Sequence, residues 1–173
     1  MDESMSESAE KAISALEKAG VGFVLLRHPA ANTMELCRGI GEEYGARHCK
    51  NLFLTNKRGT EFRLLLMDPE KPFRTSDVSR KLGVTRMSFA SAEQLRAVTG
   101  LEEGSVSVMC VVNEPARASL AGGALHVVMD AALLSREMIC VHPNDCRMTL
   151  VLRTEELLRF LASEGITPAL VEI

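Results

Sequence analysis

No apolar run in the 173-residue sequence approaches the ~18–20 residues that a helix needs to cross a bilayer, so we expect no transmembrane helix and no membrane partner. The N-terminal stretch MDESMSESAEKA is acidic and polar, without the basic patch and apolar stretch of a signal peptide. The five cysteines are odd in number and irregularly spaced, which favours a reducing compartment over a disulfide framework. We therefore expect a cytoplasmic protein.

Motifs of several common enzyme classes do not occur either. The sequence has neither G-x-G-x-x-G nor G-x-x-x-x-G-K-[ST], the glycine loops that bind nucleotide phosphates. H-E-x-x-H, G-x-S-x-G and C-x-x-C are also missing. These absences weigh against nucleotide-dependent, zinc-protease, serine-hydrolase and thioredoxin-like activities.

The composition is that of an ordinary globular protein, with 46% hydrophobic and 25% charged residues. No linker, repeat or low-complexity block interrupts the chain, so we expect one domain over residues 1–173, with an N-terminal helix within residues 1–20 packed on it. The net charge of −3 is unevenly spread: residues 45–90 carry ten basic and four acidic side chains, a local charge of +6. Such a basic segment fits either a polyanion-binding surface or a solvated face that pairs with acids elsewhere.

Hydrophobic periodicity and turn residues predict the secondary structure. We expect helices at residues 4–19, 32–44, 74–82 and 91–99 and from Thr154 onward, and strands at 22–27, 51–55, 60–67, 106–112, 124–129, 137–141 and 148–152. Asn56 to Gly59 reads as a hairpin turn, and Ser91 with Gln94 has capping-box spacing. Hairpins mixed with scattered helices favour an α+β fold around a mixed sheet, against the regular strand–helix alternation of a Rossmann fold or an α/β barrel.

The cysteines and histidines offer two weak chemical interpretations. Cys140, His142 and Cys146 form C-x-H-x₃-C, and Cys110 and His126 could lie on neighbouring strands, as a zinc site would require. The same cysteines could supply a nucleophile with His48 or His142 as its base. No second close pair completes a metal motif, and cysteines are often simply buried, so we expect no metal and no cofactor.

Three polar segments are better placed to bind a ligand. Arg47 to Asn51 leads from a predicted helix into a strand within the basic segment, where the ammonium of Lys50 could face a phosphate or a carbonyl. Gly104 to Val108 is a glycine-led loop whose backbone amides could donate to a carbonyl oxygen. His142 to Asp145 is a polar turn that could orient a ligand. Each segment taken alone could equally be an ordinary turn or strand entry.

Together and in this order, these segments resemble the YbaK/prolyl-tRNA-editing family of aminoacyl-tRNA deacylases, and most closely its free-standing ProX/PrdX-like members. The matching stretches are HCKNLFLTNKRGTEFRLLLM (48–67), KLGVTRMSFASAEQLRAVTGLEEGSVSV (81–108), MDAALL (129–134), HPND (142–145) and TEELLRFLASEG (154–165). They cover most of the chain.

The resemblance implies a single α+β domain with a mixed, mostly antiparallel sheet, a barrel-like core and surrounding helices. It implies a trans-editing hydrolase, without cofactor, that cleaves the 3′-terminal ester of mischarged aminoacyl-tRNA, with Ala-tRNA(Pro) as the first candidate. Its partners would be the tRNA acceptor end and prolyl-tRNA synthetase, and not DNA. Lys50 stands at the family's lysine position and Gly104 opens its G-x-x-x-P loop; these are the candidate catalytic residues. The candidate substrate-binding residues are His48, Asn51, Ser105, Ser107, Val108, His142 and Asn144.

The sequence departs from the family pattern at the end of this loop. Val108 stands where the family has proline, and Cys49 replaces a common threonine before Lys50. Valine lacks the fixed φ of proline, so the loop is predicted to be less rigid. Two alternatives therefore remain: a non-catalytic module that binds a tRNA end or an amino acid, and editing of another small amino acid such as serine or cysteine.

Overall fold

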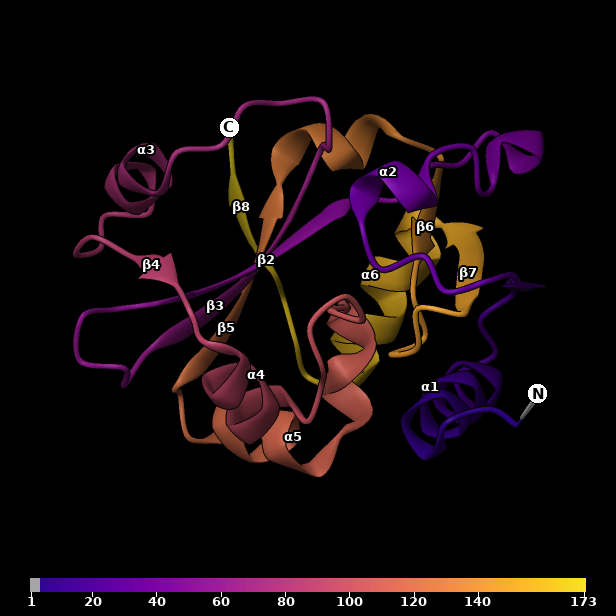
Figure 1. Cartoon of the computed structure of the whole chain (residues 1–173), viewed down its shortest axis with the longest axis horizontal. Helices are drawn as coiled ribbons and strands as arrows, with labels where there is room; N and C mark the ends of the chain where they lie inside the picture. Colours follow the sequence, from indigo (N-terminus) through magenta and orange to yellow (C-terminus); the bar gives the residue numbers. More distant parts are fainter. Residues whose placement is uncertain (1–3) are drawn as a thin grey trace.

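The computed structural model describes residues 4–173, so the first three residues of the predicted domain and N-terminal segment lie outside it. Its elements follow in chain order (Figure 1): α1 (Glu7–Lys18), β1 (Val24–Arg27), α2 (Met34–Cys37), the 3₁₀ helix η1 (Glu42–Tyr44), β2 (Lys50–Thr55), β3 (Phe62–Met67), α3 (Thr75–Lys81), β4 (Ser88–Phe89), α4 (Ala92–Thr99), the 3₁₀ helix η2 (Val108–Val112), α5 (Glu114–Ala121), β5 (Leu125–Asp130), the 3₁₀ helix η3 (Ala131–Ser135), β6 (Met138–Val141), β7 (Met148–Arg153), α6 (Thr154–Ser163) and β8 (Ala169–Val171).

The described strands form two open sheets rather than a closed barrel. The larger sheet has the order β4-β2-β3-β5-β8, in which β4, β2 and β3 pair antiparallel and β5 and β8 add in parallel. The smaller sheet has the order β1-β7-β6 and is antiparallel throughout. The predicted α+β class, with a mixed and mostly antiparallel sheet, is confirmed.

The two sheets meet at the segment that leads into β2. His48 forms an isolated parallel bridge with Cys140 of β6, and the Cys140 amide donates to the Arg47 carbonyl at 3.1 Å. Residues 47–50 therefore leave the smaller sheet and enter the larger one within a few positions. Side chains from both sheets converge at this junction.

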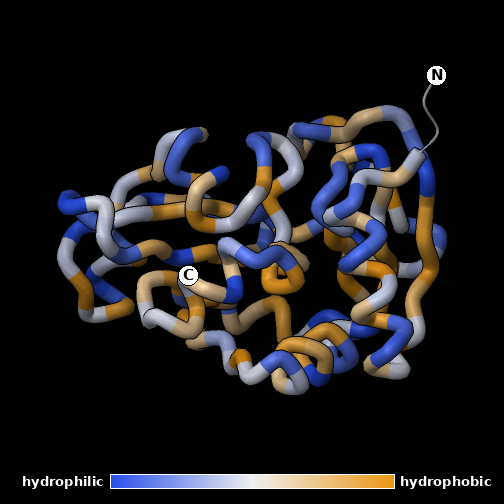
Figure 2. The backbone as a smooth tube through the Cα atoms, turned by 90° about the horizontal axis from the view of Figure 1, so that it is seen from below, coloured by the Kyte–Doolittle hydropathy of each residue, from blue (hydrophilic) through white to orange (hydrophobic). Residues whose placement is uncertain are grey.

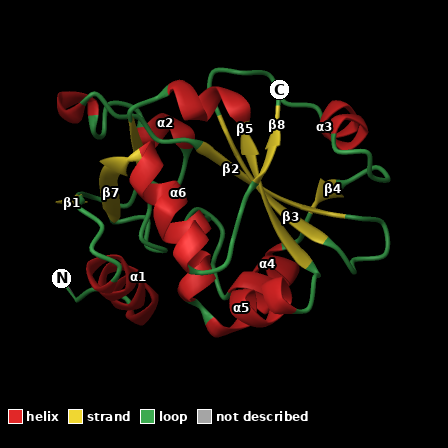
Figure 3. Cartoon of the chain, turned by 180° about the vertical axis from the view of Figure 1, so that it is seen from behind, coloured by secondary structure: helices red, strands yellow, loops and turns green. Residues whose placement is uncertain are grey.

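Helices cover the sheets and close the main core. α4 and α5 lie side by side at one end of the larger sheet, and α1 lies on the side of the smaller sheet (Figures 1 and 3). α6 buries Leu157, Phe160 and Leu161 in the main core, which also contains the whole of η2. Hydrophilic stretches gather in the outer loops of the backbone (Figure 2). No described helix is both long enough and apolar enough to cross a membrane.

Most predicted elements are present within a few residues, including the Ser91–Gln94 capping box. Two predictions are wrong. The helix expected over 32–44 is broken into α2 and η1, because Gly39 and Gly41 adopt positive φ values of 86° and 88° that a right-handed helix cannot hold. The strand expected over 106–112 is instead η2, which begins where the Ser107 side chain accepts from the Met109 amide.

Candidate active site

Lys50 is the first residue of β2 and pairs with Met67 at the end of β3. The side chain is half-buried, and no described residue forms a hydrogen bond or an ion pair with its ammonium group. The ammonium group of a lysine is a compact point charge, and its electrostatic interaction with a ligand is stronger where surrounding protein excludes water. Its free ammonium group is therefore available to an anionic or carbonyl group of a ligand.

A cavity of about 210 Å³ opens beside Lys50 at the junction of the two sheets. Five of the nine sequence-predicted site residues line it: His48, Lys50, Asn51, Gly104 and His142. They come from the entry to β2, from the loop before η2 and from the turn after β6, so the fold assembles them from distant parts of the chain. The rest of the wall consists of the segment 31–34, Cys37, Cys49, Leu52 and Val106. A second cavity of about 290 Å³ shares Met34, Cys37 and His48 with the first.

The glycine-led loop is fastened to the turn after β6 by two hydrogen bonds. The Ser107 hydroxyl donates to the His142 carbonyl at 2.6 Å, and the Cys146 amide donates to the Ser105 hydroxyl oxygen at 3.2 Å. The amides of Gly104 and Val106, both in the cavity wall, have no acceptor among residues 4–173. Two unpartnered amides beside a lysine are suited to polarising a carbonyl oxygen.

The other four predicted residues do not line this cavity. Ser105 and Ser107 hold the loop, as described, and Asn144 takes a left-handed φ of 63° and donates to the Met109 carbonyl at 3.0 Å. Val108 is fully buried in the main core as the first residue of η2. Ser105 and Ser107 thus hold the loop of the wall to the turn after β6, whereas Val108 lies in the main core and Asn144 contacts it.

The position of Val108 predicts that proline is tolerated there. The amide of Val108 has no described acceptor, proline is favoured at the first position of a helix, and Ser107 already has the extended φ and ψ of −155° and 149° that a residue before proline requires. We expect Val108→Pro to keep any activity of this site within about twofold and to change the stability by less than about 1.5 kcal/mol, or roughly 5 °C in Tm. Activity measurements and thermal melting test this; a sharp loss of activity in a folded variant would place Val108 in a retuned pocket.

The histidines of the site are held neutral. Burial, together with the nearby His142 and His28, lowers the pKa of His48 to about 3, and burial also lowers the pKa of His142. Burial raises the pKa of Cys37 to about 11, and it raises the pKa of Cys49, Cys110 and Cys140 to about 12. Since the thiolate is the nucleophilic form, these values disfavour Cys110 and Cys140 as nucleophiles.

The zinc candidates taken from sequence spacing do not converge. Cys110 is buried in the main core, the Cys140 thiol faces the Ile40 carbonyl at 3.7 Å, and His126 is exposed on β5. The structure instead brings together Cys37, His48 and His142, whose donor atoms all lie within 4.8 Å of one another. Cys37 carries no local sequence signal for this role, because it lies 105 positions from its neighbour His142.

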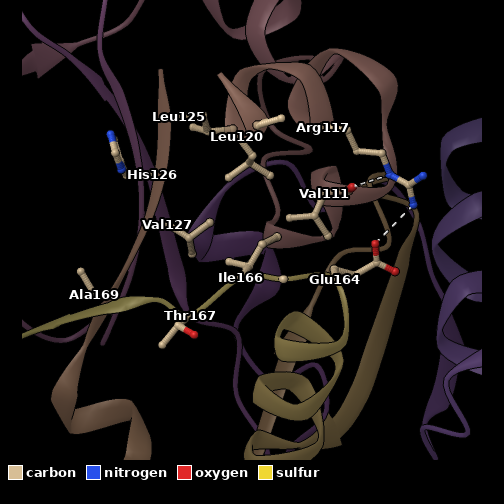
Figure 4. A pocket seen from close by; sticks show the side chains of 12 residues that line it. Val111, Arg117, Leu120, Leu125, His126, Val127, Glu164, Ile166, Thr167 and Ala169 are labelled. Atoms are coloured by element: carbon tan, nitrogen blue, oxygen red, sulfur yellow. Dashed lines mark hydrogen bonds and ion pairs between the residues drawn. The ribbon is translucent and has the colours of Figure 1, made fainter. Parts of the chain in front are cut away.

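A separate cavity of about 520 Å³ lies beside β5, between α5 and the segment after α6 (Figure 4). Its wall is apolar at Val111, Leu120 and Ile166, and its charged pair is internally satisfied: Arg117 donates to Glu164 at 3.4 Å and to the Val111 carbonyl at 3.1 Å. None of the nine sequence-predicted site residues lines it. The cavity beside Lys50 is therefore the better candidate for an active site.

Comparison with known proteins identifies relatives of the chain. The aminoacyl-tRNA editing domain family matches residues 28–160. The chain is 29% identical over 167 residues to the prolyl-tRNA editing protein ProX of Acetoanaerobium sticklandii, covering 96% of this chain and 98% of the relative. It is 25% identical to the prolyl-tRNA synthetase associated domain-containing protein 1 of Bos taurus, covering 85% and 84%. The crystal structure of a candidate trans-editing enzyme for prolyl-tRNA synthetase superposes with a TM-score of 0.69 at 22% identity, covering 98% of this chain and 99% of that one.

Proposed function

The chain belongs to the aminoacyl-tRNA editing domain family, and from this membership we propose that it is a trans-editing deacylase that removes alanine from mischarged tRNA(Pro). An editing role on prolyl-tRNA is supported by the names of its relatives. The observation that carries the proposal is the unpartnered ammonium of Lys50 in a cavity that also exposes free backbone amides. Prolyl-tRNA synthetase, the source of such mischarged tRNA, is the proposed protein partner.

The reaction asks little of the protein, because an aminoacyl ester is already activated. A water oxygen attacks the ester carbonyl carbon, the bond from that carbon to the terminal ribose oxygen breaks, and the ribose oxygen takes up a proton, releasing the free amino acid. The vicinal ribose hydroxyl is proposed to help activate the water. Lys50 would anchor the terminal phosphate or adenosine, and the amides of Gly104 and Val106 would bind the carbonyl oxygen as negative charge develops on it.

Exposed cations of the basic segment support contact with the tRNA backbone. Of its ten Lys and Arg residues, four besides Lys50 have no ion-pair or hydrogen-bond partner within residues 4–173: Lys57, Arg58, Arg74 and Arg86. All four are exposed, and Lys57 and Arg58 lie in the hairpin turn between β2 and β3. Phosphate contacts of this kind would make binding of the acceptor stem weaken as salt rises.

Selectivity would come from the size of the amino-acid pocket. A small cavity excludes a larger side chain by steric overlap, which is easier than rejecting a smaller one. The wall formed by residues 31–34 and the side chains of Cys37 and His142 limits the volume beside Lys50. Alanine is accordingly proposed as the amino acid removed, and proline as the one spared.

Release of labelled amino acid tests the proposal. Ala-tRNA(Pro), Pro-tRNA(Pro) and Ser-tRNA are compared under single-turnover conditions, and we expect the alanyl ester to be hydrolysed at least about 10-fold faster than the prolyl ester, the usual scale for a small difference in apolar bulk. Faster hydrolysis of the seryl ester would point to editing of another small amino acid. Retained tRNA binding without hydrolysis of any of these esters would contradict the enzymatic proposal and favour the binding module.

A further inference from the structure

Cys37, His48 and His142 form a buried cluster in the wall of the cavity beside Lys50, and Cys37 and His48 also line the second cavity. Cys37 ends α2, His48 precedes β2 and His142 follows β6, so three segments of the fold meet here. The Cys37 sulfur lies 3.7 Å from Nε2 of His142, and the rings of His48 and His142 lie 4.6 Å apart between centroids. The hydrogen bonds around the cluster determine which lone pairs remain free.

A chain of hydrogen bonds through Thr149 fixes the tautomer of His48. Nδ1 of His28 faces the Pro29 carbonyl at 2.8 Å and must donate, since a carbonyl only accepts. Nε2 of His28 then accepts the Thr149 hydroxyl proton, and the Thr149 oxygen, 2.8 Å from both rings, accepts from Nε2 of His48. Nδ1 of His48 is left with a lone pair, and no described residue donates to it.

His142 is oriented in the same way by a backbone carbonyl. Its Nδ1 lies 2.7 Å from the Met148 carbonyl oxygen and its Nε2 lies 3.1 Å from the Ala31 carbonyl oxygen, and a neutral ring has one N–H to donate to these two acceptors. The shorter contact assigns that proton to Nδ1, which leaves the lone pair on Nε2. That lone pair faces the Cys37 sulfur at 3.7 Å and the Ala31 carbonyl at 3.1 Å. Only the Cys37 S–H proton is available to these two acceptors, because the thiol also lies 3.4 Å from the Ala31 carbonyl. The cluster therefore has more lone pairs than N–H or S–H donors that could form hydrogen bonds with them.

We propose that Cys37, His48 and His142 form a binding site for one thiophilic divalent cation, and that zinc is the ion their donor set favours. Two neutral imidazole nitrogens and one sulfur are ligands that zinc prefers, and histidine ligands of zinc usually donate their other ring N–H to a carbonyl or another polar group, as both do here. Tetrahedral zinc separates a sulfur and a nitrogen ligand by about 3.5 Å, close to the 3.7 Å observed.

The remaining separations are compatible with binding after a small closure. One donor atom from each of the three residues lies within 4.8 Å of the other two, so the widest gap closes by no more than about 1.5 Å to reach zinc geometry. Both cavities reach Cys37 and His48, which gives an ion a route from solvent. On binding, the Cys37 S–H bond breaks, its electron pair goes to the metal and its proton goes to solvent.

This site predicts inhibition by zinc, a consequence that rests on the proposed deacylase function. Ester hydrolysis as proposed uses Lys50, free amides and water, so a chelator should leave the rate unchanged. An ion held by His48 and His142 would occupy the wall of the cavity beside Lys50 and obstruct the aminoacyl group. Zinc would act as a reversible inhibitor of this enzyme and not as its cofactor.

Titration with Co²⁺ in place of zinc tests the site without any need for activity. We expect one equivalent of Co²⁺ to give intense visible d–d bands and a near-ultraviolet sulfur-to-cobalt charge-transfer band in the wild-type chain, with zinc displacing the cobalt. Cys37→Ser, nearly isosteric, should remove the charge-transfer band and weaken binding by about 100-fold or more. His48→Gln is used only for this spectrum, and the visible bands of tetrahedral Co²⁺ should be absent from it.

Matched controls come from the same chain. Cys146→Ser and His126→Ala remove a cysteine and a histidine that lie outside the cluster, and both should retain the cobalt spectrum. Absence of the bands in the wild-type chain, or their persistence in folded Cys37→Ser, would overturn the site. So would their loss in Cys146→Ser.

The zinc arm is read as the ratio of deacylation rates with and without zinc for each variant, so a change in basal rate cancels. We expect at least about 10-fold inhibition of the wild type at saturating zinc. We expect none in Cys37→Ser, since the two histidines that remain without the sulfur bind zinc too weakly. A cobalt spectrum without any deacylation would refute the proposed function and leave the metal site standing. Deacylation without a cobalt spectrum would refute the metal site and leave the proposed function standing.

Discussion

Replacing Lys50 by alanine is expected to lower kcat/KM for Ala-tRNA(Pro) by about 100-fold or more, equivalent to about 2.7 kcal/mol of transition-state stabilisation. The ammonium group of Lys50 lies at the cavity wall and forms no hydrogen bond or ion pair with a described residue, so it is available to the substrate. For the same reason its removal leaves no buried acid or acceptor unsatisfied, and Tm should change by less than about 2 °C. Single-turnover deacylation and thermal melting measure both effects.

Lys57→Ala is the matched control for this substitution. It removes the same charge from the same basic segment, but from the exposed hairpin turn after β2. We expect it to weaken tRNA binding modestly, with a smaller salt dependence, and to leave the single-turnover rate at saturating enzyme unchanged. If Lys50→Ala and Lys57→Ala lowered activity equally, Lys50 would be one phosphate contact among several and its catalytic assignment would fail.

Elements with local signals were predictable from the sequence. Asn56 to Gly59 forms the expected turn, and Ser91 with Gln94 forms the expected capping box. The run from Val106 to Val112 was misleading, because a short continuous apolar stretch fits a buried strand and a buried helix equally well. α5 was missed although Pro115 stands in its first turn, a position that proline favours.

The site shows a similar division between what local sequence can and cannot predict. Lys50, Gly104 and His142 could be singled out because each lies in a recognisable polar segment, and they do line one cavity. Cys37 could not, since its proximity to His142 arises from the packing of α2 against the turn after β6. Val108 attracted attention as a departure from the family loop, yet its burial in the core can be seen only in three dimensions.

Gly104→Ala is expected to reduce deacylation by about 100-fold, the scale of a misplacement of about 1 Å near the reacting groups. Gly104 has a φ of 84°, and a Cβ added there would lie 2.6 Å from Cβ of Asn32 and 3.4 Å from its Cα and carbonyl oxygen. Backbone and side chain cannot both keep their places, so either the loop or the segment 31–34 must move. Both belong to the wall of the cavity beside Lys50, so the free amides of Gly104 and Val106 would move away from the substrate carbonyl.

Gly83→Ala separates this clash from ordinary backbone strain. Gly83 has a similar φ of 67° after α3, but an added Cβ meets nothing within 4 Å. An alanine in the left-handed region costs roughly 1–2 kcal/mol at either position. Both variants should therefore lose a few degrees of Tm, Gly104→Ala losing more, while Gly83→Ala keeps the deacylation rate within about twofold.

Equal Tm values and equal, near-wild-type activities for the two variants would show that the approach of Gly104 to Asn32 does not shape the cavity. A selective loss of activity in Gly104→Ala would mean that the close packing of this glycine positions the amides that the ester carbonyl requires.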